Sequence, residues 1–230
     1  KDGSIKFVTV DDSVGNTIYK KGLLFVLLYA FKLIYGSSNT LKACHSLGKG
    51  IRMRSDNALN KDDLTNIKNK MMELIEKDLK IEKVLVDKGA AIDYFINNGD
   101  FEKASTFKYL TNHYVNLYKI GDYYNYFFSY MPISTGVFTL FDLFLVDDNN
   151  FILGFPSVGN DAPEVKDYNL LLDAFNNCYK RAKRLGIFTS SDINEIVASG
   201  KIGDIIKITE VISSNDLLNI ARKIYDFGGK

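Results

Sequence analysis

Residues 19–36 read YKKGLLFVLLYAFKLIYG and contain an uninterrupted apolar run at positions 23–30. This run is too short to cross a bilayer, because a membrane-spanning helix needs about 20 predominantly apolar residues. It has two preceding lysines, as a signal peptide does, but it lies inside the chain, lacks a small-residue cleavage site and continues as FKLIYG. Gly36 is a favoured residue just after a helix end. The stretch therefore predicts a buried helix over residues 19–35.

The segments that follow this helix add both strands and helices. Residues 40–54 predict two short strands joined at the turn 48–50. Asn60 and Asp63 have the spacing of a helix N-cap and its third helical residue, and they open a long helix. The apolar stripe of that helix comprises Leu64, Ile67, Met71, Leu74 and Ile75.

The rest of the chain is β-rich in its middle and helical at its end. The predicted strands cover residues 4–10, 83–86, 114–119, 123–128, 137–146, 151–155 and 205–209. The predicted helices cover residues 87–97, 102–110, 170–185, 190–199 and 215–226. Asp147-Asp148-Asn149-Asn150 is typical of a hairpin turn. The fold class expected is α+β, with long helices packed on an antiparallel sheet and a carboxyl-terminal helical extension.

Composition narrows the classes of function. The 230 residues can bury a sizeable core, and the net charge of +1 disfavours a dedicated nucleic-acid binder, although local RNA contact stays open. Cys44 and Cys178 have no metal-binding spacing. Two reduced thiols in a cytoplasmic protein are favoured over a disulfide. No membrane partner is expected.

A second informative stretch, residues 121–136, reads GDYYNYFFSYMPISTG. It contains six aromatic residues and no Cys, His or Glu that could act as a metal ligand, nucleophile or base. Hydrolytic or metal chemistry needs such groups within reach of the reacting atom. The stretch therefore predicts packing rather than catalysis.

The candidate anion site is the turn that contains His45, Ser46 and Lys49. A lysine between glycines and a nearby serine hydroxyl can bind phosphate oxygens. The alternative is a histidine that closes a local hydrogen bond, with Lys49 solvated. No phosphate loop of the G-x-x-x-x-G-K-[ST] type is present in the sequence.

Two further candidates, Asp122 and Tyr124, lie in the aromatic stretch. The favoured interpretation of Asp122 is a turn residue, and the alternative is a ligand. Tyr124 and its neighbours Tyr123, Tyr126 and Tyr130 could stack on bases. Because no Arg or Lys accompanies them, a tyrosine-rich sheet or domain interface is favoured. His113 is interpreted as a packed or surface residue, and no metal site is expected.

Four segments in order resemble one family. They are VGNTIYKKGLLFVLLYAFKLIYG at 14–36, HSLGKG at 45–50, DDLTNIKNKMMELIEKD at 62–78 and the stretch 121–136. The order is similar to the second additional, editing-type domain of threonyl-tRNA synthetase. It is most similar to the version in the amino-terminal half of bacterial uridine kinase-like nucleoside kinases. There a TGS domain precedes the synthetase-like domain, and a P-loop kinase domain follows it.

The chain departs from that family at the editing site, which uses H-x-x-x-H on a helix and C-x-x-x-H in a loop. The alignment places the helix pair at Lys21 and Phe25 and the loop pair at Phe127 and Met131. Phenylalanine and methionine there should fill the former cleft rather than bind metal. The resemblance therefore argues against editing hydrolysis by that mechanism.

The resemblance implies a domain order and a function. Residues 1–13 would be a remnant of a TGS-like domain, residues 14–165 the editing-domain-like body, and residues 166–230 an extension toward a missing kinase domain. The chain would be a non-catalytic module without a cofactor, and its partner would be its own kinase domain. That domain would use ATP and magnesium to phosphorylate a nucleoside in the cytoplasm. The alternatives are a stand-alone aminoacyl-tRNA deacylase and an RNA-binding domain.

Overall fold

The computed structural model describes residues 8–156, 163 and 169–228. These residues fall into two compact units. Unit 1 combines residues 8–100 with 112–156 and 163, and unit 2 combines residues 101–111 with 169–228. Each unit is described by itself.

Helix α1 (Ser13–Tyr35) is the centre of unit 1. It is apolar on most sides, which is typical of a helix that neighbours surround. Its buried side chains include Leu23, Phe25 and Leu27, each fully removed from solvent. Gly36 ends the helix with a φ of 61°, a conformation that glycine adopts at little cost.

Helix α2 (Lys61–Glu76) packs on α1 through the stripe that begins at Leu64. It opens with a capping box, in which the Asn60 side chain accepts from the Asp63 backbone and the Asp63 side chain accepts from the Asn60 backbone. The Tyr35 hydroxyl also donates to Asp63 Oδ1 at 3.1 Å. The carboxyl end of α1 is thereby joined to the amino end of α2.

A four-stranded antiparallel sheet forms one wall of unit 1. Its strands are β1 (Leu41–Leu47), β2 (Gly50–Ser55), β7 (Asn150–Gly154) and β6 (Asp142–Asp147), in that order. One face of the sheet joins the α1 core through residues such as Met53, Phe151 and Leu153.

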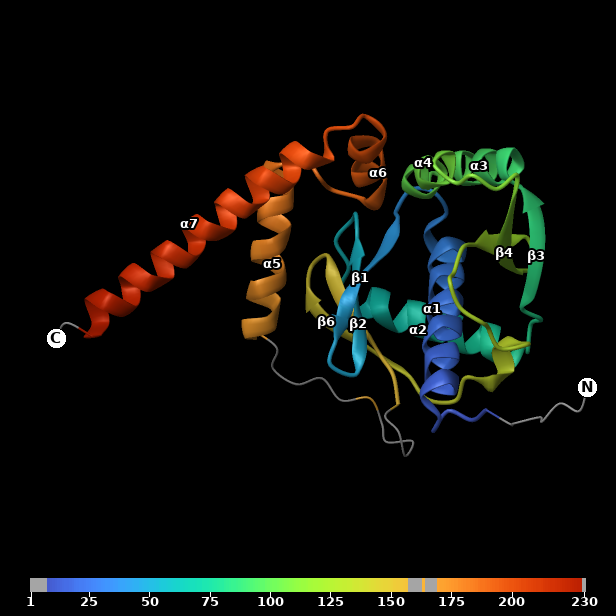
Figure 1. Cartoon of the computed structure of the whole chain (residues 1–230). Coiled ribbons are helices and arrows are strands. Elements are labelled where there is room, and N and C mark those ends of the chain that lie inside the picture. Colours follow the sequence, from blue (N-terminus) through green and yellow to red (C-terminus); the bar gives the residue numbers. More distant parts are fainter. Residues whose placement is uncertain (1–7, 157–162, 164–168, 229–230) are drawn as a thin grey trace, which may run out of the picture. The chain divides into compact units, whose positions relative to one another are not determined.

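A three-stranded antiparallel sheet contributes Tyr118 and Ile120 to the same core. Its strands are β3 (Glu82–Asp87), β4 (Tyr114–Ile120) and β5 (Tyr123–Asn125). Helix α3 (Lys88–Asn97) follows β3 directly and is capped by the Asp87 side chain. Figure 1 shows α1 between the elements of the two sheets.

Unit 2 is helical. It comprises α4 (Phe101–Lys108), α5 (Asn169–Arg184), α6 (Ser190–Ala198) and α7 (Ile202–Gly228). Ser191 Oγ donates to Ser105 Oγ at 2.6 Å and joins α6 to α4. Arg181 and Asp216 form an ion pair at 2.9 Å between α5 and α7. None of the residues of α7 is buried.

The predicted fold class is confirmed, since the described residues form helices and antiparallel sheets with a helical carboxyl-terminal part. The predicted strand 205–209 is wrong, because these residues lie inside α7. An isolated β-branched run fits either conformation, and here the surrounding residues continue as a helix.

Two other predicted strands are shorter than expected. The strand predicted from residue 123 ends at Asn125, whose side-chain oxygen accepts the Tyr126 backbone N–H at 2.8 Å. The strand predicted from residue 137 begins only at Asp142, after the 3₁₀ turn η1 (Thr135–Val137). The Tyr19 hydroxyl accepts the backbone N–H groups of residues 139 and 140, each at 3.1 Å, so they join no strand.

The predicted strand 4–10 lies partly outside the described residues, and the part from 8 to 10 is not a strand. The domain limits drawn from the sequence stay a prediction. In the part of the chain that the structure describes, no helix has the length and apolar character needed to cross a bilayer.

Candidate functional site

The aromatic stretch lies directly on α1. Phe25 of α1 is fully buried, and its ring meets that of Phe127 with centroids 5.4 Å apart. Phe127 and Met131 are partly buried and pack against the core. Three of the four positions aligned with the editing pairs are therefore apolar side chains in or against the core.

The fit between the stretch and α1 leaves no space at Gly22. A Cβ atom there would lie 2.6 Å from Phe138 and 2.7 Å from Pro132. The stretch is also fixed from the sheet, because the Tyr118 hydroxyl donates to the Ser129 carbonyl oxygen at 2.7 Å. These contacts hold the segment against the helix.

Lys21 is the one polar residue among the four aligned positions, and it is half-buried on α1. Neither phenylalanine nor methionine can take a proton from water. Three of the four side chains therefore offer no general base. Their arrangement is suited to packing.

A tyrosine cluster, consisting of Tyr29, Tyr94, Tyr123 and Tyr124, lies next to this contact. The rings of Tyr29 and Tyr123 stack with centroids 5.2 Å apart and an angle of 10°. Those of Tyr94 and Tyr124 meet edge to face at 5.1 Å, and the Tyr94 hydroxyl accepts the Tyr124 backbone N–H at 2.9 Å. The cluster therefore joins α1, α3 and β5.

Burial is the main cause that raises the pKa of Tyr94 and of Tyr123. Both hydroxyls therefore remain protonated near neutral pH and act as neutral hydrogen-bonding groups. Tyr123 and Tyr124 were predicted as candidates from the sequence, whereas Tyr29 and Tyr94 were not. Only contacts across the fold connect these residues, and no spacing signal could have indicated them.

Among the residues that the structure describes, Lys77 and Lys119 interact electrostatically with the tyrosine cluster, and each pairs with a glutamate. Lys119 interacts with Tyr124 and pairs with Glu82 at 3.2 Å, which contributes to its raised pKa. Lys77 pairs with Glu73 at 2.6 Å. Hydrogen bonds from Lys70 and Lys77 lower the pKa of Glu73 to about 2. The cations near the tyrosines are thus already partnered.

The predicted anion site lies in the other sheet. His45 is half-buried on β1, while Ser46 and Lys49 are exposed. Burial and the nearby Arg52 guanidinium lower the pKa of His45. Arg52 of β2 is therefore a charged neighbour of His45, and the lowered pKa keeps the imidazole mostly neutral near pH 7.

The candidate binding residues do not come together. His45, Ser46 and Lys49 belong to the β1–β2 hairpin, whereas Asp122 and Tyr124 belong to the β4–β5 hairpin of the other sheet. Asp122 is exposed at the turn. Within residues 8–156, 163 and 169–228, no group of three or more His, Cys, Asp or Glu side chains could hold a metal ion.

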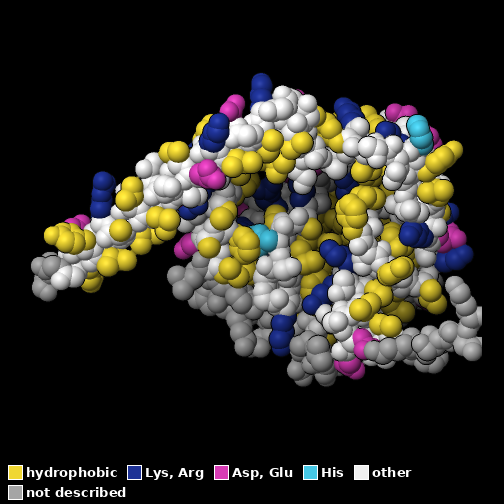
Figure 2. All heavy atoms as spheres, viewed as in Figure 1, with side chains coloured by type: hydrophobic (Ala, Val, Ile, Leu, Met, Phe, Trp, Pro, Cys, Tyr) yellow, Lys and Arg dark blue, Asp and Glu magenta, His cyan; other side chains and the backbone are white. Residues whose placement is uncertain are grey.

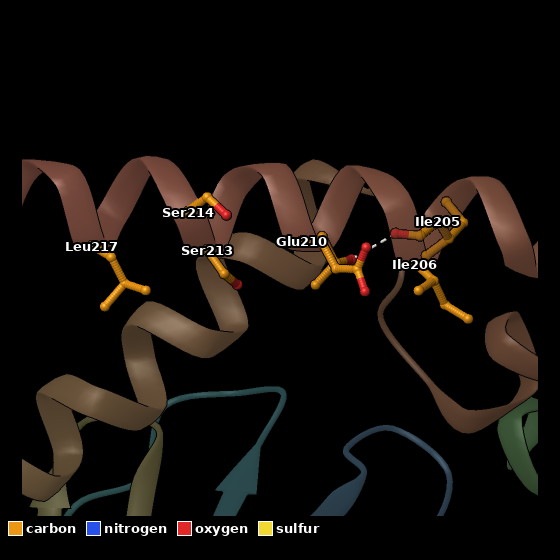
Figure 3. A pocket seen from close by; sticks show the side chains of 7 residues that line it. Ile205, Ile206, Glu210, Ser213, Ser214 and Leu217 are labelled. Atoms are coloured by element: carbon orange, nitrogen blue, oxygen red, sulfur yellow. Dashed lines mark hydrogen bonds between the residues drawn. The ribbon is translucent and has the colours of Figure 1, made fainter.

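An open depression of about 620 Å³ runs along α7 in unit 2 (Figure 3). It is lined by Ile205, Ile206, Thr209, Glu210, Ser213, Ser214 and Leu217. The Thr209 hydroxyl donates back to the Ile205 carbonyl oxygen at 2.7 Å. Figure 2 shows hydrophobic side chains along the same helix. A depression on one helix face has the form of a docking surface rather than an enclosed reaction site.

Comparison with known proteins points to one kind of relative. No protein-family model matches the chain. It is 25% identical over 126 residues to the threonine–tRNA ligase of Syntrophotalea carbinolica, covering 54% of this chain and 20% of the ligase. The threonine–tRNA ligase of Sulfurihydrogenibium sp. is 27% identical over 130 residues, with the same coverage.

The threonine–tRNA ligase of Nitrosomonas europaea is 27% identical over 124 residues, which is 53% of this chain and 20% of the ligase. The matched region thus spans about a fifth of the length of these curated relatives. These weak similarities, together with the α+β fold, support the interpretation of about half of the chain as a synthetase-like region.

Proposed function

We propose that this chain is a synthetase-like module that carries no editing activity of its own. The observation that supports this most directly is the contact between Phe25 and Phe127, with ring centroids 5.4 Å apart. Both stand where the resemblance places polar editing residues. The buried ring of Phe25 and the partly buried ring of Phe127 place no polar group at this contact that could activate a water.

The test is a deacylation assay with the purified chain. Threonyl-tRNA and seryl-tRNA are incubated with the chain, and with an editing-competent threonine–tRNA ligase as the positive control. We expect hydrolysis by the control and only the spontaneous rate with this chain. Hydrolysis that disappears in His45→Ala would contradict the proposal, because it would assign catalysis to this chain.

We further propose that the intact protein is a cytoplasmic nucleoside kinase. Its following P-loop domain would bind ATP and magnesium and phosphorylate a nucleoside. This proposal is supported only by the resemblance in the order of segments at 14–36, 45–50, 62–78 and 121–136. Reading the coding sequence beyond Lys230 tests it. A strand followed by G-x-x-x-x-G-K-[ST] is expected, and a stop codon soon after Lys230 would contradict it.

A second candidate is a stand-alone editing or RNA-binding domain. It is favoured by the four matched relatives, each of which is a threonine–tRNA ligase. Exposed aromatic side chains near the β5 end also suit base stacking, since Phe128 is 92% and Tyr130 is 73% exposed. The deacylation assay, together with a tRNA-binding titration of the same chain, separates this candidate from the first.

A further inference from the structure

The second half of α7 carries a stripe of large apolar side chains that are exposed. Its members recur every three or four residues, as the a and d positions of a coiled coil do, and they lie along one side of the helix. Each is between 53% and 89% exposed, and the members are Leu217, Ile220, Ile224 and Phe227. A row of this kind is typical of a helix that packs against another helix.

The first half of α7 continues the same side with polar residues. Counting back from Leu217 at the same spacing reaches Ser213 and Glu210. Both line the open depression, and Figure 3 shows them on the same side of the helix as Leu217. One side of α7 is therefore hollow in its first half and filled with large side chains in its second half.

A second copy of α7 that runs in the antiparallel direction is complementary to this side. A two-fold axis near residue 218 places Leu217 of one copy opposite Ile220 of the other, and Ile224 opposite Ser213. The side chain of Ile224 then fills the depression at Ser213, and it does so twice because a two-fold interface is self-complementary. Two parallel helices would instead place Glu210 against Glu210, which repels, and would leave both depressions empty.

The charged residues that flank the stripe favour the same direction. Asp216 and Lys223 each precede a residue of the stripe, and the antiparallel arrangement brings Asp216 of one copy beside Lys223 of the other. Such flanking pairs set the orientation of paired helices. Asp216 already pairs with Arg181 of α5 at 2.9 Å, so the lysine would extend an existing ion pair.

The apolar area of the stripe is close to what a dimer needs. At the exposed fractions given above, its side chains present roughly 500 Å² on one helix and roughly 1,000 Å² in a pair. Specific protein interfaces begin at about 1,000 Å² of buried surface. A membrane surface is a poorer match, because α7 has three basic and four acidic residues, whereas helices that bind membrane surfaces are rich in lysine and arginine.

We propose that two copies of this chain associate through antiparallel pairing of α7 over residues 210–227. The overlap is about 27 Å long. Because the interface is small, the dissociation constant is in the micromolar range, with monomers at about 1 µM and dimers at about 200 µM. The interface goes beyond the proposed function and uses none of the residues at the α1 contact.

Sedimentation velocity of the full chain at about 1 µM and about 200 µM tests the association. Ile220→Lys places a charge at the centre of the interface, and it should raise the dissociation constant more than about tenfold. The matched control is Ile208→Lys, because Ile208 is 46% exposed and lies on the opposite side of the helix. The control should keep the wild-type dissociation constant.

A monomer at both concentrations, or equal weakening by the two variants, would overturn the interface. Circular dichroism identifies any variant that does not fold, and Ile224→Lys replaces Ile220→Lys if that variant fails. A wild-type chain that stays monomeric but floats with vesicles of phosphatidylcholine and phosphatidylserine would show that the stripe binds lipid, and would also overturn the dimer.

A disulfide experiment tests the direction of the two helices. The two natural cysteines, both exposed, are first replaced by serine. Ser213→Cys is then introduced into one preparation and Ile224→Cys into another that carries a mass tag, and the two are mixed and oxidised at about 200 µM. We expect a crosslink between the two variants, because their positions lie opposite each other. Crosslinks of each variant only with itself would contradict the antiparallel pairing.

Discussion

Helices α1 and α7 have similar lengths but opposite surroundings. Of the 23 residues of α1, ten are buried, whereas none of the 27 residues of α7 is buried. Both helices are rich in isoleucine, leucine and aromatic residues. The difference shows that apolar content alone does not decide burial. Two sheets built from distant segments surround α1, while in unit 2 the apolar side chains of α7 remain accessible.

The largest effect in this comparison should come from removing one phenylalanine from each helix. Phe25→Ala deletes a fully buried ring, and we expect unit 1 to lose about 3–5 kcal/mol of unfolding free energy. Phe227→Ala deletes a ring that is 89% exposed, and it should change stability by less than about 0.5 kcal/mol. Urea unfolding followed by circular dichroism measures both. Equal effects would contradict the contrast between the helices.

The second pair compares two glycines. Gly22→Ala places a methyl group 2.6 Å from Phe138, and the overpacking should cost about 1–3 kcal/mol. Gly203→Ala in α7 meets nothing within 4 Å, and it should stabilise unit 2 by roughly 0.5 kcal/mol through the unfolded chain. Thermal unfolding of both variants shows whether each substitution stabilises or destabilises the protein. If Gly22→Ala were stabilising, Phe138 and Pro132 would have to move aside at little cost in free energy.

The third pair compares two threonine hydroxyls. Thr135 is fully buried, and its hydroxyl donates to the Leu74 carbonyl oxygen at 2.6 Å and accepts the Leu79 N–H at 2.8 Å. Thr135→Val should cost about 1–3 kcal/mol because it leaves backbone groups unsatisfied. Thr209→Val in α7 should be close to neutral, because its hydroxyl bond is exposed. Matching losses in the two variants would contradict this expectation.

The smallest effect concerns pH. Because burial lowers the pKa of His45 in the fold, the unfolded chain binds a proton more readily. The stability of unit 1 is therefore complete above the ordinary histidine pKa of about 6.5 and falls as the pH drops below it. His45→Gln should reduce this fall. The urea midpoints of the wild-type chain and of His45→Gln are measured at several pH values between 8 and 5. If the midpoints of the two proteins fall in parallel with pH, the prediction is contradicted.

Sequence patterns among neighbouring residues correctly predicted those elements that neighbouring residues determine. The buried helix, the Asn60–Asp63 capping box and the turn at 147–150 are fixed by neighbouring residues, and all three are present. The strand expected from residue 137 failed because the Tyr19 hydroxyl, about 120 positions away, takes the amides of residues 139 and 140. A prediction from neighbouring residues cannot include a contact between residues so far apart in the sequence.

The site was less predictable than the fold. The contact between residues 25 and 127 was expected from the family resemblance rather than from periodicity. Arg52, the neighbour of His45, was missed because pairing across a hairpin with an irregular register cannot be counted from the sequence. The tyrosine cluster was half recognised, since Tyr123 and Tyr124 are adjacent while Tyr29 and Tyr94 come from separate helices.

The strand order β1-β2-β7-β6 has a consequence for how the polypeptide can be divided. The first hairpin ends at Ser55 and the second begins at Asp142, yet their inner strands pair along five positions and Asn149 Nδ2 donates to the Ser55 carbonyl oxygen at 3.2 Å. A protease nick in the turn at Gly99 would therefore give two fragments that elute together as one particle. Unit 1 should then reassemble by fragment complementation when the two pieces are mixed.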